Sequence, residues 1–292
     1  MADELIDADR IVGERAVSFI VRGEWAHFRR VEANRTKMTY RIPPRTTIAG
    51  MLAAIAGYDR DSYYGLFGAE ESAIAVGIHP DHPVRTVSMP MLNLDTREEG
   101  ITAVETSAGT IRLPDPDISR QRYAYEFVRS PGYQVDVWLS DTAAMDELIE
   151  RLTNGRAQYA PTLGLSECLA RIEPAEVEVS AIESVEGSDT DTGSSPEGDG
   201  SDRDEHGHRI RDAPMAEIDS AVPTPAALVE QAGTSVVSER SAGWMEAHDE
   251  SRRTTGWIDW RLDPTGGTLS VRTGPGSQAT PVRIGDRTVI MT

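Results

Sequence analysis

Hydrophobic and polar positions recur with two different periods in the first 182 residues. Runs rich in β-branched and aromatic residues predict strands at 15–23, 72–80 and 133–140. Apolar residues at helical spacing predict helices at 46–58 and 141–155. A last strand is expected over 167–182, with a break at Pro174. This order predicts an α+β fold of the ferredoxin-like, RRM-like type, in which one sheet face or the loops around it are open to single-stranded RNA.

Two connections, 24–45 and 81–132, are longer than a link between neighbouring elements requires. The first interleaves Trp25, Phe28 and Tyr40 with six basic residues. Flat rings among guanidinium groups suit stacked bases and phosphates, and free N–H groups at Thr46 to Ile48 would add an anion site. The alternative is that the arginines pair with acidic surface groups while the rings belong to the core. The second connection is expected to project as a hairpin.

The sequence becomes strongly acidic and loses its apolar positions after the last predicted strand. Nine acidic residues stand against one basic residue between positions 181 and 205. Such a segment buries too little apolar surface to offset its ordering entropy, so we expect 183–215 to be a disordered acidic insertion. Residues 1–182 would then form one domain that carries 81–132 as an insertion. Residues 216–292 would form a β-rich extension packed on it.

Composition limits what the net charge says about partners. The formal net charge is -19, yet residues 10–60 hold ten basic residues against four acidic ones. Lys37 is the only lysine among 29 basic residues, a composition typical of halophilic proteins, whose long-range charge repulsion is screened by molar salt. An acidic total therefore does not exclude nucleic acid. No apolar run approaches the length of a membrane span, so we expect a cytoplasmic protein without membrane contact.

Few residues offer catalytic or metal-binding chemistry. Cys168 is the only cysteine, which excludes an internal disulfide. His79 and His82 have spacing suited to a metal but no clear third ligand, and no phosphate-binding loop is present, so neither a metal nor a cofactor is expected. His27 is the one candidate general base near the basic segment, with Tyr40 or Lys37 as its partner. A lone histidine among aromatic residues is more often a packing residue.

Four stretches of the sequence resemble a known family. They are GEWAHFRR, TYRIPPRTTIAGMLAAIAGYDRDSYYGLFG, RQRYAYEFVRSPGYQVDVWLS and YAPTLGLSECLARIE. They look like the motifs of Cas family 5, the RAMP subunit of the type I CRISPR interference complex (Cascade), and the type I-B branch is the nearest likeness. The resemblance covers residues 15–68 and 118–175. The acidic insertion departs from the family pattern.

The resemblance implies a ferredoxin-like palm with a projecting thumb hairpin and a non-catalytic, RNA-binding role in antiviral defence. Such a subunit grips the 5′ handle of the CRISPR RNA and contacts the Cascade backbone subunit and the Cascade large subunit. Carried over by position, the loop 162–167 would lie beside the handle. The residues expected to bind RNA are His27, Arg29, Arg30, Arg35, Lys37, Tyr40, Arg41, Arg45, Thr46, Thr47, Gly50, Arg120, Arg122, Arg129 and Gly164.

Two other functions remain open from the sequence. Relatives from type I-C systems cleave the CRISPR RNA precursor without metal, so a metal-independent endoribonuclease that uses His27 is an alternative. A general RNA chaperone built on the same module is another. Co-purification of a discrete guide RNA together with larger subunits would favour the first function over both.

Overall fold

The computed structural model describes residues 6–30, 36–94, 101–106, 109–114, 120–185, 214–224, 226–229, 235–248, 251–273 and 279–292. Arg35 and most of the predicted acidic insertion, 186–213, lie outside the described residues. The statements below concern the described part of the chain.

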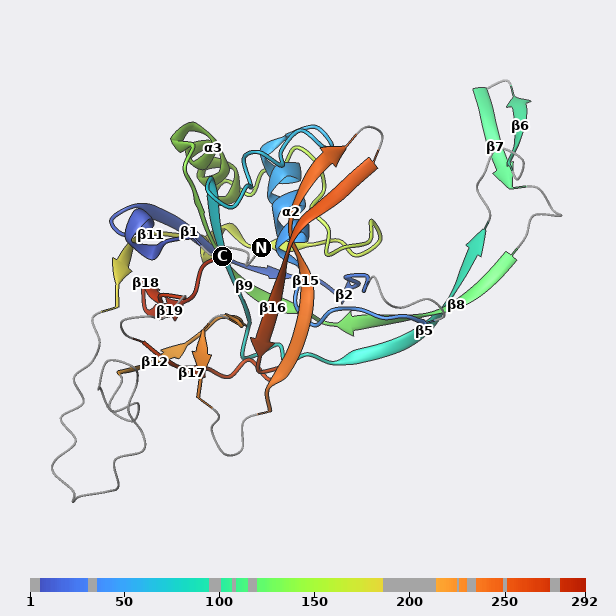
Figure 1. The fold of residues 1–292 in the computed structure, drawn as a ribbon. Coiled ribbons are helices and arrows are strands. Elements are labelled where there is room, and N and C mark those ends of the chain that lie inside the picture. The colour runs from blue at the N-terminus through green and yellow to red at the C-terminus, as the bar shows by residue number, and fades with distance from the viewer. Residues whose placement is uncertain are drawn as a thin grey trace, which may run out of the picture.

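The predicted elements form a central antiparallel sheet with two helices (Figure 1). Four of its strands are β1 (Arg15–Arg22), β4 (Ser72–Ile78), β9 (Gly132–Leu139) and β11 (Glu178–Ser184), in the order β11-β1-β9-β4, with β4 at one edge. Helix α2 (Arg45–Ala56) follows β1, and α3 (Thr142–Thr153) follows β9. The predicted break at Pro174 is confirmed: a 3-10 turn, Pro174–Glu176, separates β10 (Arg171–Ile172) from β11. All six predicted elements are present.

Local signals in the sequence set the ends of both helices. Asp141 caps α3 by accepting hydrogen bonds from the N–H groups of Ala143 and Ala144, at 2.9 and 3.1 Å. Gly57 ends α2 in the left-handed conformation, with φ of 90°, which glycine adopts without steric cost. Pro44 precedes α2 and supplies no side-chain cap. The first turn of α2 is therefore without a side-chain acceptor.

Strand alternation divides the central sheet into two faces. Val17, Phe19 and Val21 point toward α2 and α3 and join the main core. The opposite face carries Ala73, Ala75 and Trp138, which pack with α1 (Ala8–Ile11) and with residues of β18 (Val282–Ile284) and β19 (Arg287–Val289). The expectation of a sheet face open to RNA is therefore wrong, because residues near the C-terminal end of the sequence bury it.

The same residues close the outer edge of the sheet. Ile74 on β4 exchanges two main-chain hydrogen bonds of 2.9 Å with Thr292, and the Ala221 N–H donates to the Val76 carbonyl at 2.7 Å. The chain passes so close that a Cβ on Gly77 would lie 2.4 Å from the Asp219 carbonyl oxygen. An exposed edge strand would be open to pairing with another chain, and this contact prevents it.

The second long connection forms an arm (Figure 1). Strands β5 (Thr86–Leu94) and β8 (Arg120–Arg129) pair antiparallel over nine residues and extend away from the central sheet. Strands β6 (Ile101–Thr106) and β7 (Gly109–Pro114) pair with each other beyond its far end. At its base, β8 also pairs with β2 (Trp25–Ala26) and β3 (Thr36–Lys37), so the basic segment and the arm share one small sheet.

The remaining strands lie in the last eighty residues. The longest pair is β15 (Val237–His248) with β16 (Ser251–Leu262). Trp244, Trp260 and Leu262 from this pair enter the main core beside α2. Shorter strands are β12 (Met215–Ile218), β13 (Val222–Pro223), β14 (Ala227–Leu228) and β17 (Leu269–Arg272). This part of the chain is thus built into the fold on both sides of the central sheet.

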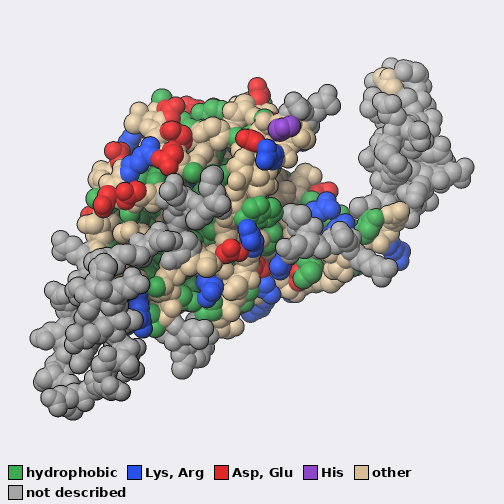
Figure 2. Space-filling model, in the orientation of Figure 1, with side chains coloured by type: hydrophobic (Ala, Val, Ile, Leu, Met, Phe, Trp, Pro, Cys, Tyr) green, Lys and Arg blue, Asp and Glu red, His purple; other side chains and the backbone are tan. Residues whose placement is uncertain are grey.

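Charge is unevenly distributed over the face shown in Figure 2. Acidic side chains gather over α1 and α3, while basic side chains are spread from β15 and β16 to the base of the arm. None of the described helices is long and apolar enough to cross a membrane.

Candidate nucleic-acid interface

The basic segment doubles back on itself before entering α2. Main-chain hydrogen bonds join Phe28 to Tyr40 and Arg30 to Met38, at 2.8 and 3.0 Å. Phe28 and Tyr40 are buried, whereas Arg29 is exposed. The guanidinium of Arg30 lies 5.3 Å from the centre of the Tyr40 ring. Some aromatic residues of this segment therefore belong to the core. This agrees with the alternative, considered from the sequence, that the rings are core residues.

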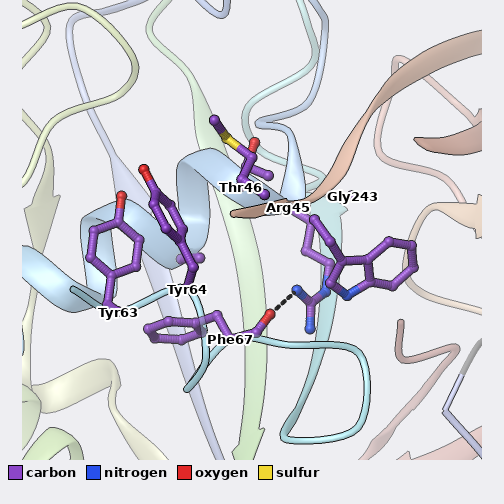
Figure 3. A pocket seen from close by; sticks show the side chains of 9 residues that line it. Arg45, Thr46, Tyr63, Tyr64, Phe67 and Gly243 are labelled. Carbon is purple, nitrogen blue, oxygen red and sulfur yellow. Dashed lines mark hydrogen bonds between the residues drawn. The ribbon is translucent and has the colours of Figure 1, made fainter. Parts of the chain in front are cut away.

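Arg45 differs most from its expected role. Its side chain is buried and donates to the main-chain oxygens of Thr292, Phe67 and Ser72, at 2.9, 2.7 and 3.0 Å, and to Ser72 Oγ at 2.7 Å. Figure 3 shows the bond to Phe67. The guanidinium carbon lies 5.2 Å from the centre of the Trp244 ring. Burial lowers the pKa of Arg45 to about 9. We expected a phosphate contact here, and the structure shows a core residue instead, because four hydrogen bonds already occupy the guanidinium.

Arg41 forms an ion pair with a buried carboxylate. Its N–H and its Nη1 both donate to the carboxylate of Glu239 on β15, at 2.8 and 2.7 Å, while Arg30 Nη1 lies 3.9 Å from the same carboxylate. The Glu239 side chain is 1% exposed, so this pair is desolvated on the acidic side. The Tyr133 hydroxyl donates to the Arg41 carbonyl at 2.8 Å. Much of the charge of Arg41 is therefore compensated within the protein.

His27 is buried under the arm. Its Nδ1–H donates to the Glu126 carbonyl at 2.7 Å, and its ring packs on Tyr125 and Phe127 with centroid distances of 5.1 and 5.5 Å. Nε2 is buried without a hydrogen-bond partner in the described part of the chain. Burial lowers the pKa of His27, so the ring is neutral at pH 7. Its side chain is a packing group rather than a surface group.

A cleft at the start of α2 brings together residues that lie far apart in the sequence. Thr46, Thr47 and Gly50 form one wall, and Gly164 with Thr162 forms another, around a cavity of about 280 Å³. Gly164 has φ of 98°, and a Cβ at this position would lie 2.0 Å from the His27 carbonyl oxygen, so only glycine fits. Four of the predicted RNA-binding residues thus meet at one site.

The anion site at the start of α2 is smaller than expected. The N–H groups of Thr47 and Ile48 donate to the Pro44 carbonyl at 2.8 and 3.1 Å. Within the described residues, the N–H of Thr46 makes no hydrogen bond. Since the helix dipole favours negative charge at this end, one N–H remains to meet an anion in the cleft.

Three further cleft residues were not predicted from the sequence. They are Tyr63 and Tyr64, which follow α2, and Arg252 on β16. Arg252 Nε and the Tyr64 hydroxyl both donate to Asp61 Oδ1, at 2.6 Å each. The Tyr64 hydrogen bond and Arg252 hold the pKa of Asp61 below its usual range. The carboxylate therefore orients a guanidinium that is 38% exposed at the cleft. Tyr63 and Tyr64 lie in the stretch DSYYGLFG of the second motif, but the sequence assigned neither of them to RNA.

The arm presents further basic and aromatic residues. Arg122 and Arg129 on β8 are exposed, whereas the side chain of Arg120 lies outside the described ones. Lys37 Nζ lies 5.0 Å from the centre of the Tyr123 ring. Tyr123, Tyr125 and Phe127 share one face of β8, as the alternation of the sequence predicted.

The described residues contain no group of three or more His, Cys, Asp or Glu side chains arranged to hold a metal ion. The rings of His79 and His82 lie 5.6 Å apart, with the Asp81 carboxylate 3.9 Å from His79.

The cleft at the start of α2 combines a helix N-terminus, an oriented guanidinium and two tyrosine rings. This set suits a phosphate beside a base.

Comparisons with known proteins find distant structural likenesses and one family match. Among solved structures, a chain of a "CRISPR RNA-guided surveillance complex" is 17% identical, with a TM-score of 0.41 over 94% of this chain and 91% of that chain. A CRISPR protein from Archaeoglobus fulgidus is 12% identical, with a TM-score of 0.49 over 94% of this chain and 98% of that chain. No curated protein sequence matches the chain. The family described as CRISPR-associated protein (Cas_Cas5) matches residues 16–245, well over half of the sequence. The chain therefore belongs to the Cas5 family of CRISPR-associated proteins.

Proposed function

We propose that the protein is a non-catalytic RNA-binding subunit of a type I CRISPR interference complex of the I-B branch. In this role it grips the 5′ handle of the CRISPR RNA and docks the backbone subunit and the large subunit. Family membership supports a role in a CRISPR effector complex. In these terms the central sheet with α2 and α3 is a ferredoxin-like palm, and the arm of β5 and β8 is its thumb.

The observation that carries this proposal is the cleft at the start of α2. Thr46, Gly50 and Gly164 come from two segments that the family resemblance assigned to the handle, and they line one cavity with Arg252 and two tyrosine rings. RNA strands are bound by stacking on such rings and by charge-assisted contacts to phosphate. The covered sheet face argues against a general chaperone that binds RNA across its sheet.

The environment of His27 supports a non-catalytic role. A general base must reach the 2′-OH of the RNA, but His27 is 1% exposed and packs beneath the arm. Incubation of the purified protein with a labelled repeat RNA tests this point. Specific cleavage that is absent from a 2′-deoxy substrate and lost in His27→Ala would make the protein an endoribonuclease.

The binding role is tested by purifying the complex at high salt from its own cells and measuring the bound RNA. Arg252→Ala removes charge-assisted hydrogen bonds worth about 1.5–3 kcal/mol, so RNA affinity should fall roughly ten- to a hundredfold. Arg283→Ala, an exposed change on β18, is the matched control. If both variants retain equal amounts of RNA, the cleft does not contact the RNA.

A second test narrows the cleft without removing charge. A Cβ on Gly50 would lie 3.0 Å from the Tyr63 hydroxyl, so Gly50→Val should push that ring into the cavity. RNA retention should fall while helix α2 persists, because valine forms helices better than glycine. Ala143→Val, at an exposed position of α3, should leave RNA retention unchanged.

A further inference from the structure

A second cleft lies near the other end of α2. It is lined by Ile55 near the end of α2, by Arg151 and Leu152 in the last turn of α3, and by the segments 155–157 and 170–172, and it has a volume of about 240 Å³. Its apolar lining consists of aliphatic side chains from Ile55, Leu152, Ala157, Pro161, Ala170 and Ile172. None of the described residues that line it is aromatic.

Basic side chains line this cleft, and the acidic side chains of the same stretch do not. Residues 141–176 hold seven acidic and three basic residues, and the three basic ones, Arg151, Arg156 and Arg171, all line the cleft. None of the seven acidic residues does. A stretch that is acidic overall therefore presents a positive rim around an aliphatic floor.

The three guanidinium groups keep donors for a ligand. Arg151 and Arg171 each use only Nε, toward Glu147 and Glu173, and these exposed pairs contribute little to stability. Their terminal nitrogens, like the whole Arg156 side chain, make no hydrogen bond to another described residue. The planar fork of such groups matches a carboxylate or phosphate in a bidentate manner.

The lining of the cleft distinguishes between these two anions. Single-stranded nucleic acid is held by aromatic platforms together with basic groups, and the aliphatic floor offers no such platform. Protein interfaces instead combine arginine and tyrosine with a desolvated apolar pocket. Tyr159 and Leu169, which flank the lining segments, are 50% and 61% exposed. The observations therefore favour a protein ligand.

The second cleft, called the arginine cleft after Arg151, Arg156 and Arg171, adjoins the cleft at the start of α2, called the RNA cleft. Ala160 and Thr162 line the RNA cleft, whereas Pro161 between them lines the arginine cleft. One layer of chain therefore separates the two sites. On the other side, Ala170 and Arg171 also line a third cavity of about 610 Å³ that includes Trp25 and Leu169. An extended segment would thus find a continuous surface across β10.

We propose that the arginine cleft docks an acidic segment of a protein partner, which inserts an apolar side chain between carboxylates that pair with Arg151, Arg156 and Arg171. This rests on the proposed function, since the partner is a protein subunit of the same effector complex. Docking there sets that subunit directly behind the RNA cleft.

The test compares complexes purified with wild-type chain, with Arg151→Glu/Arg156→Glu/Arg171→Glu, and with the control Arg10→Glu/Arg240→Glu/Arg283→Glu, whose arginines are exposed elsewhere. The cleft variant should lose at least tenfold of one protein subunit while the CRISPR RNA remains, and the control should lose neither. Full retention of every subunit, or loss of RNA with all proteins retained, would overturn the proposal. If the wild-type protein itself carries neither RNA nor partner subunits, the proposed function is contradicted and the docking proposal is not the cause.

Two further measurements make the outcome of this test decisive. The glutamine triple variant at the same positions serves if charge reversal prevents folding, which the thermal unfolding transition reports. A photo-crosslinking residue at Ala157 should capture the lost subunit, and mass spectrometry should find the crosslink in a peptide that carries carboxylates beside an apolar residue. A crosslink only to RNA, or to a peptide without carboxylates, would contradict the proposal.

Discussion

Two arginines four positions apart, Arg41 and Arg45, occupy opposite environments. Arg41 is 36% exposed and pairs with a buried carboxylate, whereas Arg45 is buried among carbonyl oxygens. The difference arises because α2 begins at Arg45 and turns its side chain under the sheet edge, where Ser72 and Thr292 lie. At this scale residue type alone does not distinguish a binding group from a structural one.

Replacement of Arg45 should therefore affect stability first. Arg45→Ala leaves three main-chain oxygens and a hydroxyl buried without their donor, so the free energy of unfolding should fall by roughly 3–5 kcal/mol. Arg122→Ala, at an exposed position, should change it by less than about 0.5 kcal/mol. Chemical denaturation measures both. Loss of RNA from a fully stable Arg45→Ala protein would restore the phosphate role.

The buried state of His27 predicts a pH dependence of stability. Its folded pKa lies below the ordinary value of 6.5, so in the window just below pH 6.5 the unfolded chain binds a proton that the folded protein does not. Stability should therefore fall as the pH drops from 7 toward 5, by at most about 1.4 kcal/mol per pH unit.

His27→Asn should remove this slope while retaining a hydrogen-bond donor near the Nδ1 position. Denaturation of both proteins between pH 5 and 7.5 supplies the comparison. His79, whose pKa is also lowered by burial, contributes equally to both and cancels. Identical slopes would show that His27 is not the group responsible.

At the scale of elements, the arm and the basic segment form one unit. β8 pairs with β5 along the arm and with β2 and β3 at its base, so the arm is continuous with the segment that leads into α2. Its exposed arginines lie on a strand whose other side chains pack on His27 and Trp25. The exposed arginines of the arm therefore belong to the same unit as the segment that leads into the cleft.

Charge reversal on the arm should reduce RNA binding without unfolding the protein. Arg122→Glu/Arg129→Glu removes two exposed positive charges, so RNA retention should fall and the salt dependence of binding should weaken. A filter-binding titration at several salt concentrations measures both quantities. An unchanged salt slope would show that neither side chain meets phosphate.

At the scale of the whole molecule, the last eighty residues complete the core. They bury one face of the central sheet, close the β4 edge and supply Glu239 to Arg41. Trp244 and Trp260 add to the core beside α2. The last eighty residues therefore share the core of the first 182 residues.

A chain cut after residue 185 should consequently not fold. It would expose Ala73, Ala75 and Trp138 and leave β4 without its edge partner, so no cooperative unfolding transition is expected. Replacing residues 187–212 by a short Gly/Ser linker should leave the transition of the full chain unchanged. Cooperative unfolding of the shortened chain would contradict the role assigned to the last eighty residues.

The sequence by itself determined the local elements. Periodicity and caps located β1, α2, β4, β9 and α3 to within a few residues, because these signals act between neighbours along the chain. The motif strings also pointed to Thr46, Thr47, Gly50 and Gly164, which meet in one cleft.

Only the tertiary structure decided which arginine side chains are exposed and which are buried or paired within the protein. Arg45, Arg41 and Arg252 have the same side chain, and their roles depend on Thr292, Glu239 and Asp61, which lie some 190 to 250 positions away in the sequence. The cover over the second sheet face likewise comes from distant segments, α1 and residues 282–291. Burial and pairing are set by contacts between distant segments, and such contacts leave no periodic signal in the local sequence.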